Sequence, residues 1–73
     1  MKIIDIGFYR TRGGKVAFVS GFDESYDKRY PVKGCIINVD TECWTKHGSY
    51  LIDETNANDL VELIKPYSEE LLK

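Results

Sequence analysis

The first half of the chain alternates apolar and polar residues with the two-residue period of a β-strand. The period is clearest in segment 2–9, where three apolar residues stand at every second position: Ile4, Ile6 and Phe8. A second apolar run, 16–19, is rich in residues that favour strands. Gly13 and Gly14 lie between the two runs and supply the positive φ angles that a tight turn requires. We therefore predict an antiparallel hairpin at the start of the chain.

Further strands are predicted after a polar, charged loop at 21–29. Pro31 keeps the residue before it extended, so the chain leaves this loop without a helix. Short turns at 40–41 and 46–48 then separate the next three expected strands, which are 32–39, 42–45 and 49–52. Two large rings, Phe18 and Trp44, are expected in the core because they bury the most area available to so small a protein.

The last segment, 60–73, allows two interpretations. Its apolar residues fall at helical spacing: Leu60, Leu63, Ile64, Tyr67 and Leu71. Asn56 and Asn58 are capping candidates, and Pro66 interrupts the pattern. The composition slightly favours a helix over 58–65, a break at Pro66 and a second helical turn beyond it. The alternative is a short last strand, 60–64, followed by a terminal helical turn at 68–72.

These elements predict a mainly β fold of the α+β class in a single small domain, 1–73. About five short strands would form a small, curved antiparallel sheet with a short C-terminal helix. The sheet could close as an SH3-like barrel or stay open with that helix on one face. An open sheet exposes an edge, so self-association into a homo-oligomer follows as one expectation.

Composition places the chain among soluble globular domains. It has 73 residues, of which 42% are hydrophobic and 30% charged, which is an ordinary globular mixture and excludes a disordered chain. No apolar run approaches the length of a membrane span, and no charged leader precedes an apolar stretch. We expect a cytoplasmic protein with no membrane partner.

Catalytic and metal chemistry find little support. Cys35 and Cys43 would face each other across a three-residue loop, whereas a loop of two or four residues would offset them, and we expect free thiols. With His47 they lack the fourth ligand and the short spacings of a structural zinc site. No serine or cysteine has an activating motif around it. We predict a protein that is not an enzyme and has no cofactor, metal ion or catalytic residue.

Positive charge is concentrated in the first half of the chain. Residues 1–35 hold seven basic and four acidic side chains, and residues 36–73 hold three basic and eight acidic ones. Four basic residues are candidates for a phosphate-bearing ligand, a nucleotide or a single nucleic-acid strand: Arg10, Arg12, Lys15 and Arg29. The net charge of -2 argues against nonspecific binding of duplex nucleic acid, because that affinity comes mainly from neutralised phosphates.

The polar loop also carries aromatic residues, which suggests a recognition surface. Aromatic and arginine side chains supply much of the binding energy in protein interfaces. The candidates for contact with a partner protein are Phe22, Tyr26, Lys28, Arg29 and Tyr30.

Four short motifs resemble a family of small uncharacterised proteins encoded by tailed bacteriophages and prophages. They are Thr11-Arg12-Gly13-Gly14-Lys15-Val16, Tyr30-Pro31-Val32-x-Gly34, Trp44-Thr45-x-x-Gly48-x-Tyr50 and Asp59-Leu60-Val61. The likeness runs from about residue 9 to residue 61. The chain departs from it in the longer charged loop at 22–29 and in the extension past Pro66.

This resemblance implies a phage origin and an intracellular setting, but no activity or catalytic residue. Phage accessory proteins of this size often act by stoichiometric binding, some of them against host defence. The leading hypothesis is a non-enzymatic module that docks on a host or phage protein through the loop and a sheet edge. The alternatives are binding of a phosphate-bearing ligand and a self-associating structural phage component.

Overall fold

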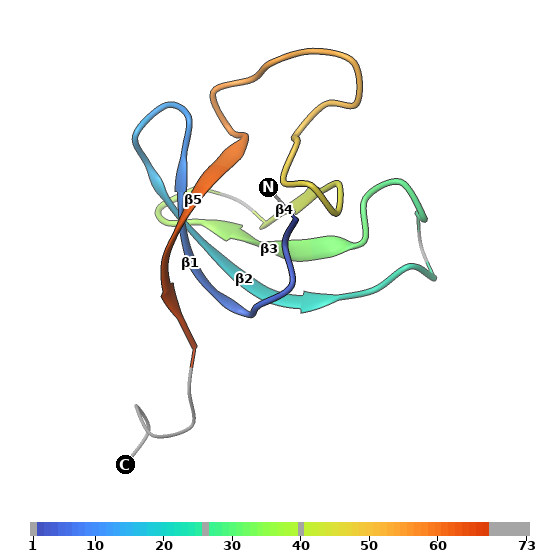
Figure 1. The fold of residues 1–73 in the computed structure, drawn as a ribbon, viewed down its shortest axis with the longest axis horizontal. Coiled ribbons are helices and arrows are strands. Elements are labelled where there is room, and N and C mark those ends of the chain that lie inside the picture. The colour runs from blue at the N-terminus through green and yellow to red at the C-terminus, as the bar shows by residue number, and fades with distance from the viewer. Residues whose placement is uncertain (1, 26, 40, 68–73) are drawn as a thin grey trace.

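The chain folds into one antiparallel sheet of five strands (Figure 1). The computed structural model describes residues 2–25, 27–39 and 41–67. The strands, in chain order, are β1 (Gly7–Thr11), β2 (Val16–Phe22), β3 (Val32–Ile36), β4 (Thr41–Trp44) and β5 (Leu60–Pro66). They are arranged in the order β4-β3-β2-β1-β5, and no helix occurs among the described residues. The mainly β prediction is thus confirmed, and the sheet is open.

The predicted N-terminal hairpin is confirmed, and its turn geometry recurs later in the chain. At the first turn, Gly14 has φ 87°, and the Lys15 backbone N–H donates to Thr11 Oγ1 over 2.9 Å. At the turn after β4, Gly48 also has φ 87°, and Ser49 donates in the same way to Thr45 Oγ1. Both turns follow the pattern Thr-x-x-Gly, in which glycine supplies the left-handed position at low cost.

The helix predicted over 58–65 is wrong, because residues 60–66 form strand β5, in agreement with the alternative interpretation of a last strand over 60–64. Two register shifts in the pairing of β1 with β5 explain why the pattern looks helical. Each shift adds one residue to β5, so Leu60, Leu63 and Pro66 pair with alternate residues of β1. A strand with two bulges thereby acquires a three-residue spacing. The helical turn expected at 68–72 lies outside the described residues.

The strand predicted over 49–52 is also wrong. This segment forms bends after the second Thr-x-x-Gly turn. The Tyr50 backbone N–H donates to the side chain of Asp59 over 2.8 Å instead of pairing with a strand. Close by, the Leu60 N–H donates to the Gly48 carbonyl. The five strands are therefore completed by β5 and not by the segment after β4.

The core lies on one face of the sheet, here called the inner face. It consists of eight buried apolar residues: Ile3, Tyr9, Ala17, Val19, Val32, Ile36, Trp44 and Leu60. The prediction for Trp44 is confirmed, since its ring is fully buried and its Nε1–H donates to the Asn58 carbonyl over 2.8 Å. A buried indole N–H needs such an acceptor.

The prediction that Phe18 belongs to the core is wrong. Phe18 is half-buried on the opposite, outer face, because its neighbours Ala17 and Val19 in β2 are the residues that point inward. Its ring lies against Phe8 of β1, with centroids 5.0 Å apart, and against Tyr67 at 6.2 Å. The outer face thus holds an aromatic cluster of its own. Among the described residues no helix is long and apolar enough to cross a membrane.

Candidate functional site

The loop between β2 and β3 is held in shape by two aspartates. The Asp23 carboxylate accepts hydrogen bonds from the backbone N–H and the hydroxyl of Ser25. Four residues later, the Asp27 carboxylate accepts from the backbone N–H of Arg29 over 2.9 Å. Such aspartate turns fix a loop without a helix or strand. The Asp23 N–H donates to the Pro31 carbonyl, which closes the base of the loop.

Arginine and tyrosine are brought together at the far end of this loop. The Arg29 guanidinium donates to both oxygens of Asp27, from Nε over 3.2 Å and from Nη2 over 3.1 Å. The same guanidinium lies 5.8 Å from the centre of the Tyr30 ring, within the range of a cation–π contact. The hydrogen bonds from Arg29, first those of its side chain and then that of its backbone, lower the pKa of Asp27, so the pair stays charged.

The remaining residues predicted to contact a partner lie on the same loop or at its start. Phe22 ends β2 with 46% of its surface exposed and pairs with Val32 across the sheet. Lys28 is exposed and Tyr30 is half-buried, and Tyr26 lies outside the described residues. The structure therefore places Phe22, Lys28, Arg29 and Tyr30 on one loop.

The four basic residues predicted to bind phosphate are not brought to one place. Arg10 is paired with Glu62 of β5 over 3.0 Å, and Arg12 with Asp59 over 3.3 Å. Lys15 stands at the end of the same turn. Arg29 lies beyond the other end of β2, a strand of seven residues, which spans roughly 23 Å at ~3.3 Å per residue. All three arginines thus have carboxylate partners, and only Arg10, Arg12 and Lys15 share one end of the sheet.

Asp59, which the sequence analysis did not single out as a site residue, is the centre of a buried polar cluster. It is 5% exposed, and its carboxylate accepts three hydrogen bonds. The donors are the backbone N–H of Tyr50 at 2.8 Å, that of Asn56 at 3.0 Å and Arg12 Nε at 3.3 Å. The available signal in the sequence was a lone aspartate directly before the apolar run that begins at Leu60.

Backbone hydrogen bonds tie the same segment to the first turn. The Arg12 N–H donates to the Asp59 carbonyl and the Gly13 N–H donates to the Ala57 carbonyl, both over 2.8 Å. We call residues 56–60, with the two Thr-x-x-Gly turns that they contact, the Asp59 clamp. The clamp joins the first hairpin, the turn after β4 and the start of β5.

The charge of Asp59 is maintained by its partners. Burial raises the pKa of this carboxyl. The hydrogen bonds from the Tyr50 and Asn56 backbones and from the Arg12 guanidinium together lower the pKa by more than burial raises it, so the net effect is a lowered pKa. The carboxylate is therefore ionised at neutral pH. Its contacts are satisfied within the chain, which assigns it to stability and not to chemistry.

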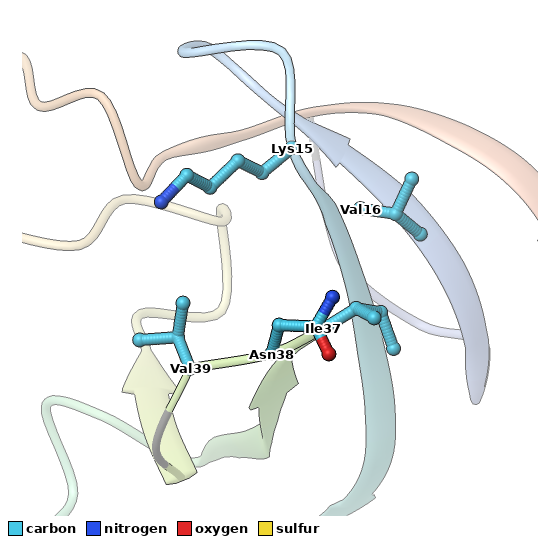
Figure 2. Close-up of a pocket in the computed structure, with 5 residues that line it drawn as sticks. All are labelled: Lys15, Val16, Ile37, Asn38 and Val39. Atoms are coloured by element: carbon cyan, nitrogen blue, oxygen red, sulfur yellow. The ribbon is translucent and has the colours of Figure 1, made fainter.

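A shallow recess of about 370 Å³ lies at the turn end of the sheet (Figure 2). The described residues that line it are Lys15, Val16, Ile37, Asn38 and Val39. Figure 2 shows that the Lys15 side chain extends toward the side of the recess where Val39 lies. Among these described residues the lining is mostly apolar, and Lys15 is the charged one.

The two cysteines are free and half-buried. In the β3–β4 hairpin Cys35 is opposite Thr41 and Cys43 is opposite Lys33, so the two thiols are offset along the ladder. The last pair of this ladder is Cys35 with Thr41, so the turn is centred on residue 38. The two cysteines would face each other only if the turn were centred on residue 39. Within the described part of the chain, no three His, Cys, Asp or Glu side chains are grouped to hold a metal ion.

Comparison with known proteins gives no relative. No family model matches the chain, no curated protein matches it, and no solved structure matches it. The likeness to small phage proteins therefore stays a prediction from the motifs.

Proposed function

We propose that the chain is a non-enzymatic binding module that docks on another protein through the β2–β3 loop. The observation that carries this proposal is the cation–π contact between Arg29 and Tyr30, in which Asp27 holds the Arg29 guanidinium in place. Phe22 is exposed at the start of the same loop. Arginine and aromatic side chains form the energetic centre of many protein interfaces.

The internal order of the loop supports this proposal. Binding costs free energy when side chains and loops become fixed in the complex, and a loop that is already fixed avoids part of that cost. Here the turns at Asp23 and Asp27 fix the backbone, and the two hydrogen bonds to Asp27 fix the Arg29 guanidinium. The loop thus presents the Arg29 cation beside the Tyr30 ring in a defined arrangement.

The proposed partner is a host or phage protein in the cytoplasm of a bacterial cell, and an anti-defence role is included in the proposal. The support for this setting is the four-motif resemblance alone. The alternative, a phosphate-bearing ligand, receives less support. Arg10, Arg12 and Arg29 each contact a carboxylate, which reduces the positive charge that a phosphate would meet.

The test uses the tagged full chain to capture proteins from a bacterial lysate and measures the amount of each captured protein. The same measurement is made with the double variant Phe22→Ala/Tyr30→Ala. The control is Ile52→Ala, because Ile52 is similarly exposed, at 49%, but lies in the connection after β4. We expect at least one protein to be retained by the wild type and the control and lost with the double variant. An identical set of retained proteins for all three chains would refute docking through this loop.

We also propose that the sheet curves into a partly open, SH3-like barrel whose gap lies between β4 and β5. A four-strand meander with a fifth strand returning to β1 is compatible with that arrangement. NMR contacts between side chains of β4 and β5, together with backbone amides of both edges that exchange with solvent, would support it. Absence of those contacts would support a plain open sheet, and protection of the amides of both edges would support a closed barrel.

A further inference from the structure

Strand β5 forms an edge of the sheet (Figure 1), and it carries exposed apolar side chains. The three large ones are Val61, Leu63 and Ile64, which are 36–46% exposed. An edge strand also presents backbone N–H and C=O groups that pair readily with another strand. This edge therefore combines free backbone groups with apolar side chains.

The apolar surface continues from β5 onto the outer face. The Tyr67 N–H donates to the Ile6 carbonyl, which extends the pairing beyond the end of β5, and both residues are 38% exposed. The Tyr67 ring also contacts Phe18. We define the β5 patch as Ile6, Val61, Leu63, Ile64 and Tyr67. Contiguous exposed apolar patches mark interaction surfaces.

Charges on β5 identify the occupant that fits this patch. Glu62 is opposite Arg10 and Lys65 is opposite Phe8, two residues that share the outer face of β1. Glu62 and Lys65 therefore share that face, although they are three positions apart, because Ile64 is the extra residue of a bulge. The strand thus carries one negative and one positive charge on the same face, on either side of Leu63 and Ile64.

This arrangement is complementary to itself. When two copies of β5 run antiparallel about a two-fold axis near residues 63 and 64, Glu62 of each copy lies beside Lys65 of the other. A two-fold interface uses the same patch on both subunits, so each contact occurs twice. Glu62 uses Oε1 for its bond to Arg10.

We propose that the chain forms a symmetric homodimer through the β5 patch, with the two β5 strands antiparallel and Glu62 paired with Lys65 of the partner subunit at both ends. Pro66 cannot donate a hydrogen bond, and the bulges twist the strand. The paired segment is therefore short, and the apolar side chains of the patch supply most of the contact.

The first test is sedimentation equilibrium of the full chain over micromolar to millimolar concentrations. We expect the wild type to shift from monomer to dimer and Ile64→Lys to remain a monomer with an unchanged circular dichroism spectrum. The matched control is Val39→Lys, because Val39 is similarly exposed, at 45%, beside the opposite edge of the sheet. A monomeric wild type, or an Ile64→Lys chain that dimerises like the wild type, would overturn the proposal.

Charge reversal tests the pairing itself. Glu62→Lys and Lys65→Glu each place like charges together in a homodimer, and each is expected to weaken dimerisation on the order of ten-fold. An equimolar mixture of the two variants should recover a heterodimer, since its charges are again opposite. Equal weakening in the mixture would rule out this pairing. Phe22→Ala, at the end of β2 where the β2–β3 loop begins, should leave dimerisation unchanged, which separates this proposal from the proposed function.

Discussion

The Asp59 clamp and the β2–β3 loop are both irregular polar segments shaped by aspartate side chains, yet they differ in where those side chains point. In the clamp, Asp59 is buried and its carboxylate bonds to residues far away along the chain, such as Arg12. In the loop, the carboxylates of Asp23 and Asp27 accept hydrogen bonds from Ser25 and Arg29, each two positions further along the chain. One arrangement connects elements of the fold, and the other shapes a surface.

This difference leads to opposite expectations for substitutions. Changes in the clamp should reduce the free energy of unfolding, because they remove long-range contacts in a small domain whose total stability is about 4–11 kcal/mol. Changes in the loop or on the outward side of β5 should alter binding and leave folding nearly unaffected.

The largest effect is expected for Asp59→Ala. The substitution leaves the N–H groups of Tyr50 and Asn56 and the Arg12 guanidinium without their acceptor. Hydrogen bonds to charged groups contribute about 1.5–3 kcal/mol each and are not additive, so we expect a loss of about 4 kcal/mol. Urea unfolding followed by tryptophan fluorescence measures it. A loss below about 1 kcal/mol would show that the clamp does not hold the fold together.

The two Thr-x-x-Gly turns provide a matched pair of substitutions. Gly14 and Gly48 both have φ 87°, so alanine at either position pays the left-handed penalty of about 1–2 kcal/mol. A Cβ atom at Gly14 meets open space, whereas one at Gly48 would lie 2.9 Å from the Leu60 carbonyl oxygen. We expect Gly48→Ala to cost about 3 kcal/mol and Gly14→Ala about 1 kcal/mol. Equal losses in urea unfolding would show that the contact with Leu60 is not restrictive.

Acid should weaken the clamp. The pKa of Asp59 is lowered in the folded chain, so its contribution is complete above the unfolded value of about 3.9 and disappears as the pH falls through the folded value. The wild type should therefore lose stability below about pH 4 faster than Asp59→Asn, which has no proton to bind there. Parallel urea titrations between pH 2 and pH 6 measure how the free energy of unfolding of each chain changes with pH. The same pH dependence in both chains would contradict a stabilising role for the ionised Asp59 carboxylate.

The smallest effects on folding are expected for Phe22→Ala and Ile64→Lys. Both side chains are 46% exposed, and surface substitutions away from caps, cores and buried charges usually change stability by about 0.5 kcal/mol. We allow up to about 1 kcal/mol for Phe22 because its ring is partly buried. Thermal unfolding of both variants beside the wild type tests this. A loss as large as that of Asp59→Ala would end the proposed separation between fold and surface.

Local signals in the sequence were sufficient for local structure. Gly14 marked the first hairpin turn, and the fully buried Trp44 was expected in the core. The period of two correctly predicted a strand at Phe8, whereas Ile4 and Ile6 precede β1. Phe8 lies on the outer face of the sheet, and Tyr9 points inward. Periodicity cannot tell which face of a strand becomes buried when both rows are apolar.

Features that depend on contacts between distant segments were not predicted. The spacing of Leu60 and Leu63 resembles a helix, and only the bulged pairing with β1 explains it as a strand. Asp59 looked like an ordinary polar residue because its partners Arg12 and Tyr50 lie 47 and 9 positions away. For the candidate site, the sequence identified the loop residues, but the contacts that join Asp27, Arg29 and Tyr30 required the fold.

The central claim is that the β2–β3 loop is a docking surface on a fold stabilised elsewhere. The most direct test measures two quantities on the Phe22→Ala/Tyr30→Ala chain, the recovery of a partner protein from lysate and the midpoint of urea unfolding. We predict that the partner is lost while the midpoint stays close to that of the wild type. Retention of every partner at an unchanged midpoint would contradict the claim.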